Sequence, residues 1–400
     1  MGTRRQPNPL ARSSAAAPGN GRRPVELSRA EARRLLVAHL GLAKVLGRGA
    51  RGTRAVLDKL RCIQLDPLDV LGTNADLVVM ARVDGVHRGD VWRHLFPEHA
   101  FEHFAKERCI LPARAFPWYA TRGHQAQTPW WSHGERERRV PPALVDAVLR
   151  EVRERGPVTA RELTDHGSVE PLDWSGWMGT AKATSMALEI LWTRLDIVVC
   201  GRTESGAKIY RVPDFPAAEV GDFDRWAVRE RAHAAGLLTR TSGGSLWSML
   251  RDVRQSPLIE EMVESGELVD VTIEESPRRY LAVPEFLKTK RVPYDDRVRV
   301  LGPLDPLMWD RDLLRHAFDF DYVWEVYKPA PQRKWGWYVV PLLQRDQFIG
   351  RMDARVEGDR LVVSKLWLES DDADRDAIAA ALQRHAELCG ATRVKMPRRW

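Results

Sequence analysis

The sequence of 400 residues carries 62 basic and 55 acidic side chains, which gives a net charge of +7, and 44% of its residues are hydrophobic. A chain of this length and composition can bury more than one core, so we expect a folded protein of roughly two to four domains. No run of roughly 20 apolar residues and no apolar N-terminal segment is present, which argues against a membrane span and a secretory signal. The modest basic excess favours a nucleic-acid partner only weakly, because many globular proteins share it.

The sequence contains four cysteines, which lie far apart: Cys62, Cys109, Cys200 and Cys389. They form no Cys-x-x-Cys pair and have no histidine partner at ligand spacing, so we expect no zinc knuckle. Thiols distributed in this way are typical of a reducing compartment. We therefore expect a cytoplasmic protein.

The N-terminal third begins with residues 1–24, which are rich in Arg, Pro, Ser, Ala and Gly and have no apolar periodicity, so we expect a disordered basic tail. A helix should follow, because Ser28 is a good N-cap with Glu31 three residues later. A second short helix is expected at 54–60. Residues 62–66 then alternate like a strand until Pro67 ends it. Helix, helix and strand are the start of a winged-helix unit.

The middle of the chain repeats this order with clearer signals. We expect helices at 142–155 and 183–195 and a short helix capped by Thr159 and running to 163. Strands at 197–200 and 208–212 flank a turn with Ser205 and Gly206, which suits a hairpin wing. A third repeat has helices at 223–237, 245–250 and 257–265, followed by strands at 268–273 and 279–283.

The C-terminal part becomes rich in strands, which we expect at 322–326, 336–342, 347–356 and 360–368, before a helix at 372–388. The predicted fold class is therefore α+β, with three tandem winged-helix modules followed by a β-rich C-terminal domain. We expect the modules at 25–135, 136–220 and 221–297, and the last domain, with its terminal helix, at 298–400.

Seven segments of the sequence together resemble the AlkZ/YcaQ (AlkX-like) family of winged-helix DNA glycosylases. They are LSRAEAR at 27–33, CIQLDPL at 62–68, FEHF at 101–104, LDPLMWDR at 304–311, FDY at 320–322, PAP at 329–331 and WGWYVVP at 335–341. The resemblance covers nearly all of the expected folded part. It implies the same fold that the pattern of helices and strands predicts.

The resemblance also implies an activity, which is hydrolysis of the N-glycosidic bond of N7-alkylated purines in double-stranded DNA, including guanines tied into interstrand crosslinks. The family carries this chemistry on a Gln-x-Gln or Gln-x-Asp motif, and this chain has the second form in Gln64 and Asp66. That form is similar to the branch with a general repair role and not to the branch linked with self-resistance to one toxin. We expect a monomer without cofactor, metal or obligate protein partner, associated with the nucleoid.

The two motif residues suit this chemistry physically. Side chains two apart in a strand point to one face, so Gln64 and Asp66 can share one polar surface. An alkylated, positively charged guanine leaves easily, so the difficult centre is the sugar, where a carboxylate such as Asp66 can stabilise the oxocarbenium ion and accept a proton from water. Gln64 can orient that water. No lysine is needed, so we expect a monofunctional enzyme that leaves an abasic site.

Other interpretations of the same residues stay open. An Asp before a Pro is common turn chemistry and a Gln at a strand end is usually solvated, so without the resemblance a structural role is favoured. A non-enzymatic winged-helix regulator is the alternative function. The spacing His99, Glu102, His103 is that of inverted zinc peptidases, but no third acidic ligand stands out, so packing is favoured over a zinc hydrolase.

Candidate DNA contacts are basic and aromatic. Trp335 and Trp337 should alternate onto one strand face beside Lys334, where they can stack on DNA or pack between domains. Residues 304–311 are expected to form a buried structural hinge. Phosphate contacts are expected from helix starts and wings. The basic candidates are Arg33, Arg34, Arg48, Arg51, Arg54, Lys182, Arg194, Arg202, Lys208, Lys334, Arg398 and Arg399.

Overall fold

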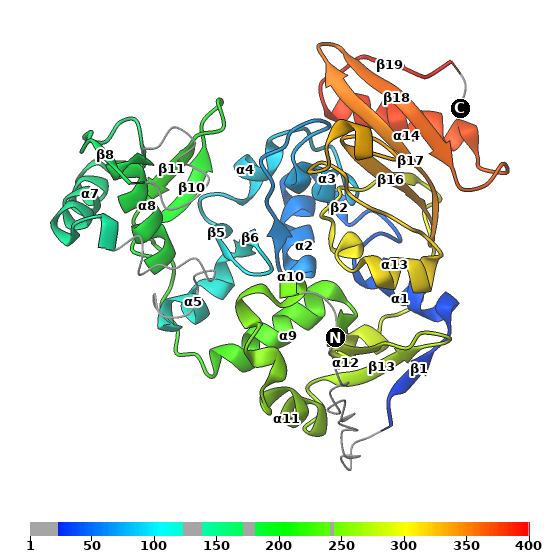
Figure 1. Ribbon diagram of the computed structural model, residues 1–400, viewed down its shortest axis with the longest axis horizontal. Coiled ribbons are helices and arrows are strands. Elements are labelled where there is room, and N and C mark those ends of the chain that lie inside the picture. The colour runs from blue at the N-terminus through cyan, green and yellow to red at the C-terminus, as the bar shows by residue number, and fades with distance from the viewer. Residues whose placement is uncertain (1–22, 123–137, 171–180, 241–243, 399) are drawn as a thin grey trace, which may run out of the picture.

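The computed structural model describes residues 23–122, 138–170, 181–240, 244–398 and 400. The expected tail, apart from its last two residues, and Arg399 lie outside the described residues. Helices and strands are mixed along the chain, as the α+β prediction requires (Figure 1). In Figure 1 a lobe containing α7 and α8 stands to the left, the C-terminal sheet lies at the upper right, and the unit of α9 to α12 lies below.

The N-terminal segment ties two parts of the chain together. Strand β1 (Val25–Leu27) pairs in parallel with β13 (Val269–Ile273). Helix α1 (Arg29–His39) follows, and its capping box is formed, with Glu31 N donating to Ser28 Oγ at 3.2 Å and Ser28 N donating to Glu31 Oε2 at 3.0 Å. The predicted N-cap is confirmed. Helix α2 (Gly49–Leu60) begins earlier than predicted.

A three-stranded sheet follows α2, in the order β3-β6-β5. The chain turns into it at Arg61, whose φ of 66° is left-handed. The sequence did not predict the elements between the strands. The elements of this region are β2 (Gly47–Arg48), β3 (Ile63–Gln64), α3 (Asn74–Met80), β4 (Val83–Asp84), α4 (Asp90–Leu95), β5 (Ala100–Phe104), β6 (Arg108–Pro112), η1 (Ala113–Ala115) and α5 (Phe116–Arg122).

The left-hand lobe has its own core, which includes Val148, Ile190 and Trp192. The helices at 142–155 and 183–195 and the hairpin are confirmed. The expected helix at 159–163 is wrong, because Thr159 pairs with Ile209 in the sheet and the following residues form a turn. The elements are α7 (Pro142–Arg155), β7 (Val158–Thr159), β8 (Ser168–Val169), β9 (Ala181–Lys182), α8 (Ala183–Arg194), β10 (Val198–Arg202) and β11 (Lys208–Arg211).

The lower unit matches the predicted order of helices and strands. Its sheet has the order β1-β13-β14-β12, so the N-terminal strand completes it. Its elements are α9 (Phe223–Ala235), β12 (Leu238–Thr239), α10 (Gly244–Trp247), η4 (Ser248–Leu250), η5 (Val253–Gln255), α11 (Leu258–Glu264), β13, β14 (Arg279–Ala282) and α12 (Pro284–Leu287).

The C-terminal part contains a five-stranded sheet in the order β15-β16-β17-β18-β19, with α14 packed on it. The expected strand at 322–326 is wrong, because this segment folds as a loop in which the Tyr322 hydroxyl donates to the Val339 carbonyl at 2.5 Å. The elements are β15 (Val298–Val300), η6 (Pro306–Met308), α13 (Arg311–Phe318), η7 (Ala330–Gln332), β16 (Val339–Gln344), β17 (Gln347–Glu357), β18 (Arg360–Leu368), α14 (Arg375–Leu388) and β19 (Arg393–Lys395).

A buried ion pair joins the N-terminal and C-terminal parts. Arg82 and Asp305 are both fully buried, and the guanidinium donates to the two carboxylate oxygens at 2.7 and 3.0 Å. Arg82 also donates from Nε to the Leu40 carbonyl at 2.7 Å. Such a bidentate pair fixes the geometry of both partners. Residues 304–311 therefore have the buried structural role that the sequence suggested.

Candidate active site

The motif residues lie at the end of the short strand β3. Ile63 and Gln64 pair with Ile110 and Cys109 of β6, and Leu65 N still donates to the Arg108 carbonyl at 2.8 Å. The chain leaves the sheet at Asp66, whose Oδ1 accepts from Leu68 N at 2.9 Å. The strand is thus shorter than predicted, and the turn chemistry expected of an Asp before a Pro is present. Gln64 lies in the sheet and Asp66 at its rim.

Gln64 is held at both its backbone and its side chain. It is only 7% exposed. Its carbonyl accepts from Asn74 Nδ2 at 2.8 Å, and Asn74 Oδ1 in turn accepts from Leu304 N at 3.2 Å. Its Oε1 accepts from Lys106 Nζ at 3.0 Å. An ammonium group has no acceptor, so the carboxamide must turn its oxygen towards Lys106 and its NH2 away from it.

Lys106 is a site residue that sequence reasoning missed. It lies in the turn of the β5–β6 hairpin and is 6% exposed, with Nζ at 5.4 Å from the centre of the Trp309 ring. Burial lowers its pKa to about 8. A lysine in a hairpin turn is normally expected to be exposed, so the sequence indicated Lys106 only by its position just after the segment at 101–104. Trp309, which covers Lys106, comes from much later in the chain.

Asp66 is half-buried and chemically available. Burial raises its pKa, and the hydrogen bond from Leu68 opposes that shift only in part. Its second oxygen, Oδ2, has no hydrogen-bond partner among the residues that the structure describes. Burial and then the negative charge of Asp66 raise the pKa of both Tyr327 and Tyr338. The carboxylate therefore lies close to the loop before β16.

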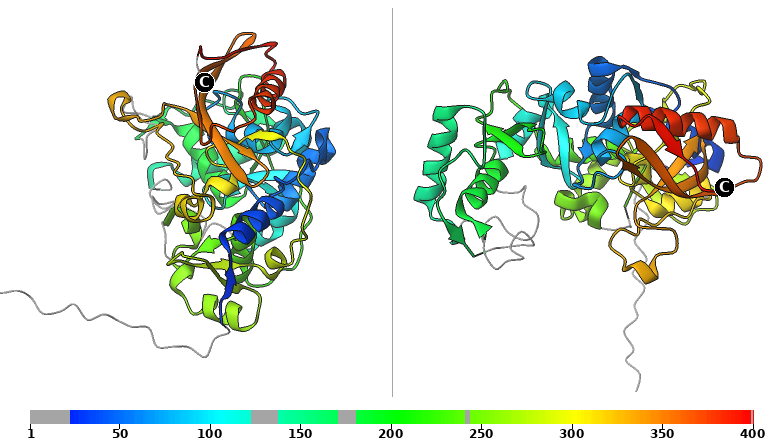
Figure 2. Two further views of the ribbon diagram at one scale, coloured as in Figure 1. Left: turned by 90° about the vertical axis from the view of Figure 1, so that its right-hand side faces the viewer. Right: turned by 90° about the horizontal axis from the view of Figure 1, so that it is seen from above.

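That loop, residues 319–338, is called the aromatic loop below. Tyr327 is 84% exposed and Trp337 is 40% exposed, and Val323 is exposed beside them. Trp324 packs edge-on against Tyr327 with ring centres 5.8 Å apart. The views of Figure 2 show the loop, in gold, projecting from the body of the molecule. Protruding aromatic rings thus lie beside a half-buried carboxylate.

Glu325 fixes the shape of the aromatic loop. Its carboxylate accepts from the backbone N–H groups of Lys334 at 3.1 Å and Trp335 at 2.7 Å. Burial would raise its pKa, but these bonds and the one from Lys328 lower it to about 2. Trp335 packs edge-on against Trp367 at 5.3 Å and is half-buried. The prediction that Trp335 and Trp337 share a strand face is wrong, because β16 begins only at Val339.

The spacing of His99, Glu102 and His103 does not make a metal site. The segment is the strand β5 and not a helix, so Glu102 and His103 point to opposite faces. Glu102 pairs with Arg202, and His103 Nε2 lies 3.2 Å from the Thr193 carbonyl. Within the described part of the chain no group of three or more His, Cys, Asp or Glu side chains could hold a metal ion.

The basic candidates are scattered and are not gathered into one patch. Several of them make internal contacts. Arg33 donates to the Ala317 carbonyl at 2.9 Å, Arg202 pairs with Glu102, and Lys208 lies 3.0 Å from Glu189. Arg34 and Arg194 are half-buried. The exposed candidates are Arg48, which lines a cavity described below, Arg51, Lys334, Arg398, Arg54, which lies 2.9 Å from His99 Nε2, and Lys182, which lies 3.6 Å from Asp165.

An enzyme that removes a base from DNA needs a group that can stabilise a cation at the sugar and a surface that can hold bases. Asp66 and the aromatic loop have these properties, and the class of protein is a DNA glycosylase. A family model described as "DNA glycosylase AlkZ-like" matches residues 57–388, and the chain belongs to this family. The resemblance noted in the sequence is confirmed.

A solved structure, that of Streptomyces sahachiroi DNA glycosylase AlkZ, is similar to this chain. The TM-score is 0.56 at 15% sequence identity, and the match covers 93% of this chain and 100% of that one. At this identity the likeness concerns the fold. None of the helices in the described ranges is both long and apolar enough to cross a membrane.

Proposed function

We propose that this DNA glycosylase hydrolyses the N-glycosidic bond of N7-alkylated purines in double-stranded DNA, with Asp66 and Gln64 at its catalytic centre. The observation that supports the proposal is a half-buried Asp66 whose Oδ2 has no partner among the described residues, two positions along the chain from a carboxamide with a fixed orientation. Crosslinked guanines are included as substrates, because Asp66 lies only half-buried at the rim of a sheet, where the chain leaves room for a bulky adduct.

The chemistry follows from the charge on the substrate. The bond between C1′ and N9 breaks, and its electron pair neutralises the alkylated base, which leaves. The positive charge that develops at C1′ and the ring oxygen is stabilised by the Asp66 carboxylate. A water molecule then forms a bond to C1′ and gives its proton to Asp66, whose raised pKa makes it a better base than an exposed aspartate. The product is an abasic site and a free base.

Gln64 and Lys106 have different roles in this scheme. Because Lys106 engages the Gln64 oxygen, the Gln64 NH2 group is the part that faces the reaction, and it donates to the attacking water or to the sugar. Lys106 is a positioning residue that acts through Gln64. The enzyme is monofunctional in this scheme, and borohydride tests that point, since a lysine that attacked C1′ would be trapped on the DNA.

DNA binding is assigned to the aromatic loop and to exposed basic residues. We assign stacking on the bases next to the lesion to Tyr327 and Trp337, since both are exposed and stacking tolerates any sequence, as a lesion enzyme requires. Among the exposed basic candidates, we assign phosphate contacts to Arg51, Lys334 and Arg398, and to Arg54 and Lys182, which then exchange their contacts with His99 and Asp165 for phosphate.

We also propose the modular organisation that the sequence suggested. Helices followed by the hairpins β5–β6, β10–β11 and β13–β14 support three winged-helix modules at 25–135, 136–220 and 221–297, before a C-terminal domain at 298–400. The first and third modules are joined by the pairing of β1 with β13. One such chain suffices to contact DNA, so we propose that it acts as a monomer.

The test is base release from a duplex with a single N7-methylguanine. After incubation, heating in alkali converts each abasic site into a strand break. The controls are the same duplex without the methyl group and the methylated duplex without protein, because N7-methylguanine also leaves slowly on its own. We expect breaks only at the methylated guanine and only after alkali. Intact DNA at an excess of protein would refute the enzyme and favour a DNA-binding regulator.

A further inference from the structure

A cavity of about 210 Å³ lies where the N-terminal part meets the C-terminal sheet and helix α14. Its walls come from four segments that are far apart in the sequence, namely 45–48, 80–85, 297–300 and 381–388. It is distinct from the site of Asp66, none of whose residues line it. Arg48 at its mouth is exposed and the Arg297 side chain is 38% exposed, so the cavity is open to solvent.

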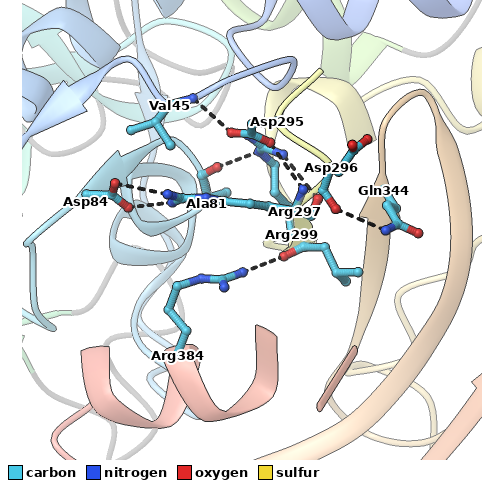
Figure 3. A network of polar contacts seen from close by, with 10 residues as sticks. Val45, Ala81, Asp84, Asp295, Asp296, Arg297, Arg299, Gln344 and Arg384 are labelled. Carbon is cyan, nitrogen blue, oxygen red and sulfur yellow. Dashed lines mark hydrogen bonds and ion pairs between the residues drawn. The ribbon is translucent and has the colours of Figure 1, made fainter. Parts of the chain in front are cut away.

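Guanidinium groups dominate the polar wall of this cavity (Figure 3). Arg297 donates to both oxygens of Asp84 at 2.6 and 3.3 Å, and Arg299 pairs with Asp295 at 2.6 Å. The fully buried Arg82 also lines it but is neutralised by Asp305. Two arginines remain without a carboxylate partner in the part of the chain that the structure describes. They are Arg48 and Arg384.

The charges around the cavity do not balance. Four arginines, Arg48, Arg297, Arg299 and Arg384, face the two carboxylates of Asp84 and Asp295, so four positive charges against two negative ones leave an excess of +2. This excess is concentrated between packed elements, where solvent screens it less than on an open surface. A doubly charged anion would neutralise it.

Some guanidinium N–H groups at the cavity also lack a hydrogen-bond acceptor among the described residues. Arg384 rises from α14 and uses one Nη to bind the Val298 carbonyl at 3.0 Å, which leaves its other nitrogens without a partner among the described residues. Burial and then the neighbouring Arg297 and Arg299 lower the pKa of Arg384, because these like charges repel one another. The Arg48 side chain makes no hydrogen bond or ion pair within the described ranges, although its backbone pairs with β4. Unused guanidinium forks match phosphate oxygens in geometry.

We propose that this cavity is a binding site for a phosphate dianion, as inorganic phosphate or as the phosphate of a small monoester. Its volume is below the range of about 300 to 1,000 Å³ that is usual for larger organic ligands, so it suits the phosphate group and little more. Apolar side chains such as Val45, Met80 and Leu388 complete the lining and accommodate a short carbon skeleton.

The position of the cavity indicates that its occupant is a free phosphate and not the DNA phosphate next to the reacting base. In both views of Figure 2 the aromatic loop projects from one side of the C-terminal sheet and α14, in red, lies on the other. DNA held against Tyr327 therefore approaches the face away from Arg384. A phosphate of the DNA backbone that wraps further around the protein is the other source of the same chemistry.

The test is a calorimetric titration, in which inorganic phosphate is added to the full chain at constant ionic strength and the heat of binding is measured. We expect saturable binding at one site, weakened at least about tenfold by Arg384→Gln and by Arg48→Gln, since each removes charged hydrogen bonds. Arg48 is exposed, so its variant keeps the fold even if Arg384→Gln does not. Arg345→Gln is the matched control, because Arg345 is exposed and pairs with Asp296 outside the cavity.

The outcomes separate cleanly. No saturable binding, or equal binding by all three variants and the native protein, overturns the site. If unmodified duplex DNA displaces phosphate and Arg48→Gln weakens binding of that duplex, the occupant is a backbone phosphate. If the duplex leaves phosphate binding unchanged, the occupant is a free phosphate. Base release is measured in parallel, so failure of the glycosylase proposal is distinguished from failure of this one.

Discussion

Lys106 Nζ lies 3.0 Å from Gln64 Oε1, and both side chains are almost completely buried. This contact fixes the orientation of the Gln64 carboxamide. It also means that β3, which leads into the proposed catalytic residues, depends on a residue of the β5–β6 hairpin and, through Trp309, on the C-terminal part of the chain. The activity should therefore respond to changes at residues that never touch DNA.

Asp66→Asn should lower the rate of base release by about 10² to 10⁴-fold, because it removes both the charge that stabilises the sugar cation and the base that accepts a proton. Affinity for the modified duplex should stay within about threefold, since the loss falls on the transition state. Single-turnover alkaline cleavage measures the rate and fluorescence anisotropy the affinity. If the variant kept the native rate, the catalytic role proposed for Asp66 would be wrong.

The pH profile should have an acid limb set by Asp66. Its pKa is raised above the ordinary value of 3.8, so the carboxylate is lost at a higher pH than for an exposed aspartate. Because the ionised form is the active one, the rate should fall as the pH drops through that raised pKa. Single-turnover rates between about pH 4 and 7 measure it. A flat profile over this range would contradict the assignment.

Lys106→Met should lower the rate and alter the alkaline side of the profile. The native ammonium has a pKa of about 8, so the native rate should decline as the pH rises through 8 and Gln64 loses its charged partner. Lys106→Met should show no such decline, and Lys106→Arg, which stays charged, should also lack it while keeping more activity. An unchanged alkaline limb in both variants would show that Lys106 does not act on the reaction.

Tyr327→Ala and Trp337→Ala should weaken binding of the modified duplex by about 5- to 150-fold each, the range expected for loss of one base stack. Both rings are exposed, so stability should not change. Val323→Ala, on the same loop, is the control and should have little effect because it has no ring. Native affinity in both aromatic variants would exclude the loop from the DNA contact.

Asp305→Asn should lower the free energy of unfolding by about 3 to 5 kcal/mol, because it leaves the fully buried Arg82 without its counter-charge. Urea denaturation followed by circular dichroism measures this. Asp58→Asn breaks the exposed pair with Arg114 and should cost less than about 1 kcal/mol. Equal effects of the two variants would mean that the buried pair does not hold the two parts together.

The sequence predicted well what local chemistry decides. The Ser28 and Glu31 capping box, the helix α7 and the hairpin β10–β11 all rest on neighbouring residues. The expected strand at 322–326 failed because its alternation is used for long-range contacts, such as that of Tyr322 with Val339. Alternation alone cannot distinguish a strand from a loop that is tied down by its own side chains.

The sequence predicted only some of the residues of the candidate site. Gln64 and Asp66 were singled out through the motif, although β3 ends at Gln64 and Asp66 lies beyond it. Lys106 and Tyr327 were missed because burial of the first and exposure of the second depend on distant parts of the chain. Several basic candidates, such as Arg202, form ion pairs within the protein, and the spacing of residues in the sequence does not predict such pairs.

Asn74 binds the carbonyl of Gln64 and the N–H of Leu304, and Trp309 covers Lys106. The candidate site is therefore built from both the early and the late part of the chain. A chain that ends at residue 300 contains Gln64, Asp66, Asn74 and Lys106 but lacks Leu304, Trp309 and the aromatic loop. We therefore expect such a shortened chain to be inactive towards alkylated DNA, because the proposed site is incomplete without these later residues.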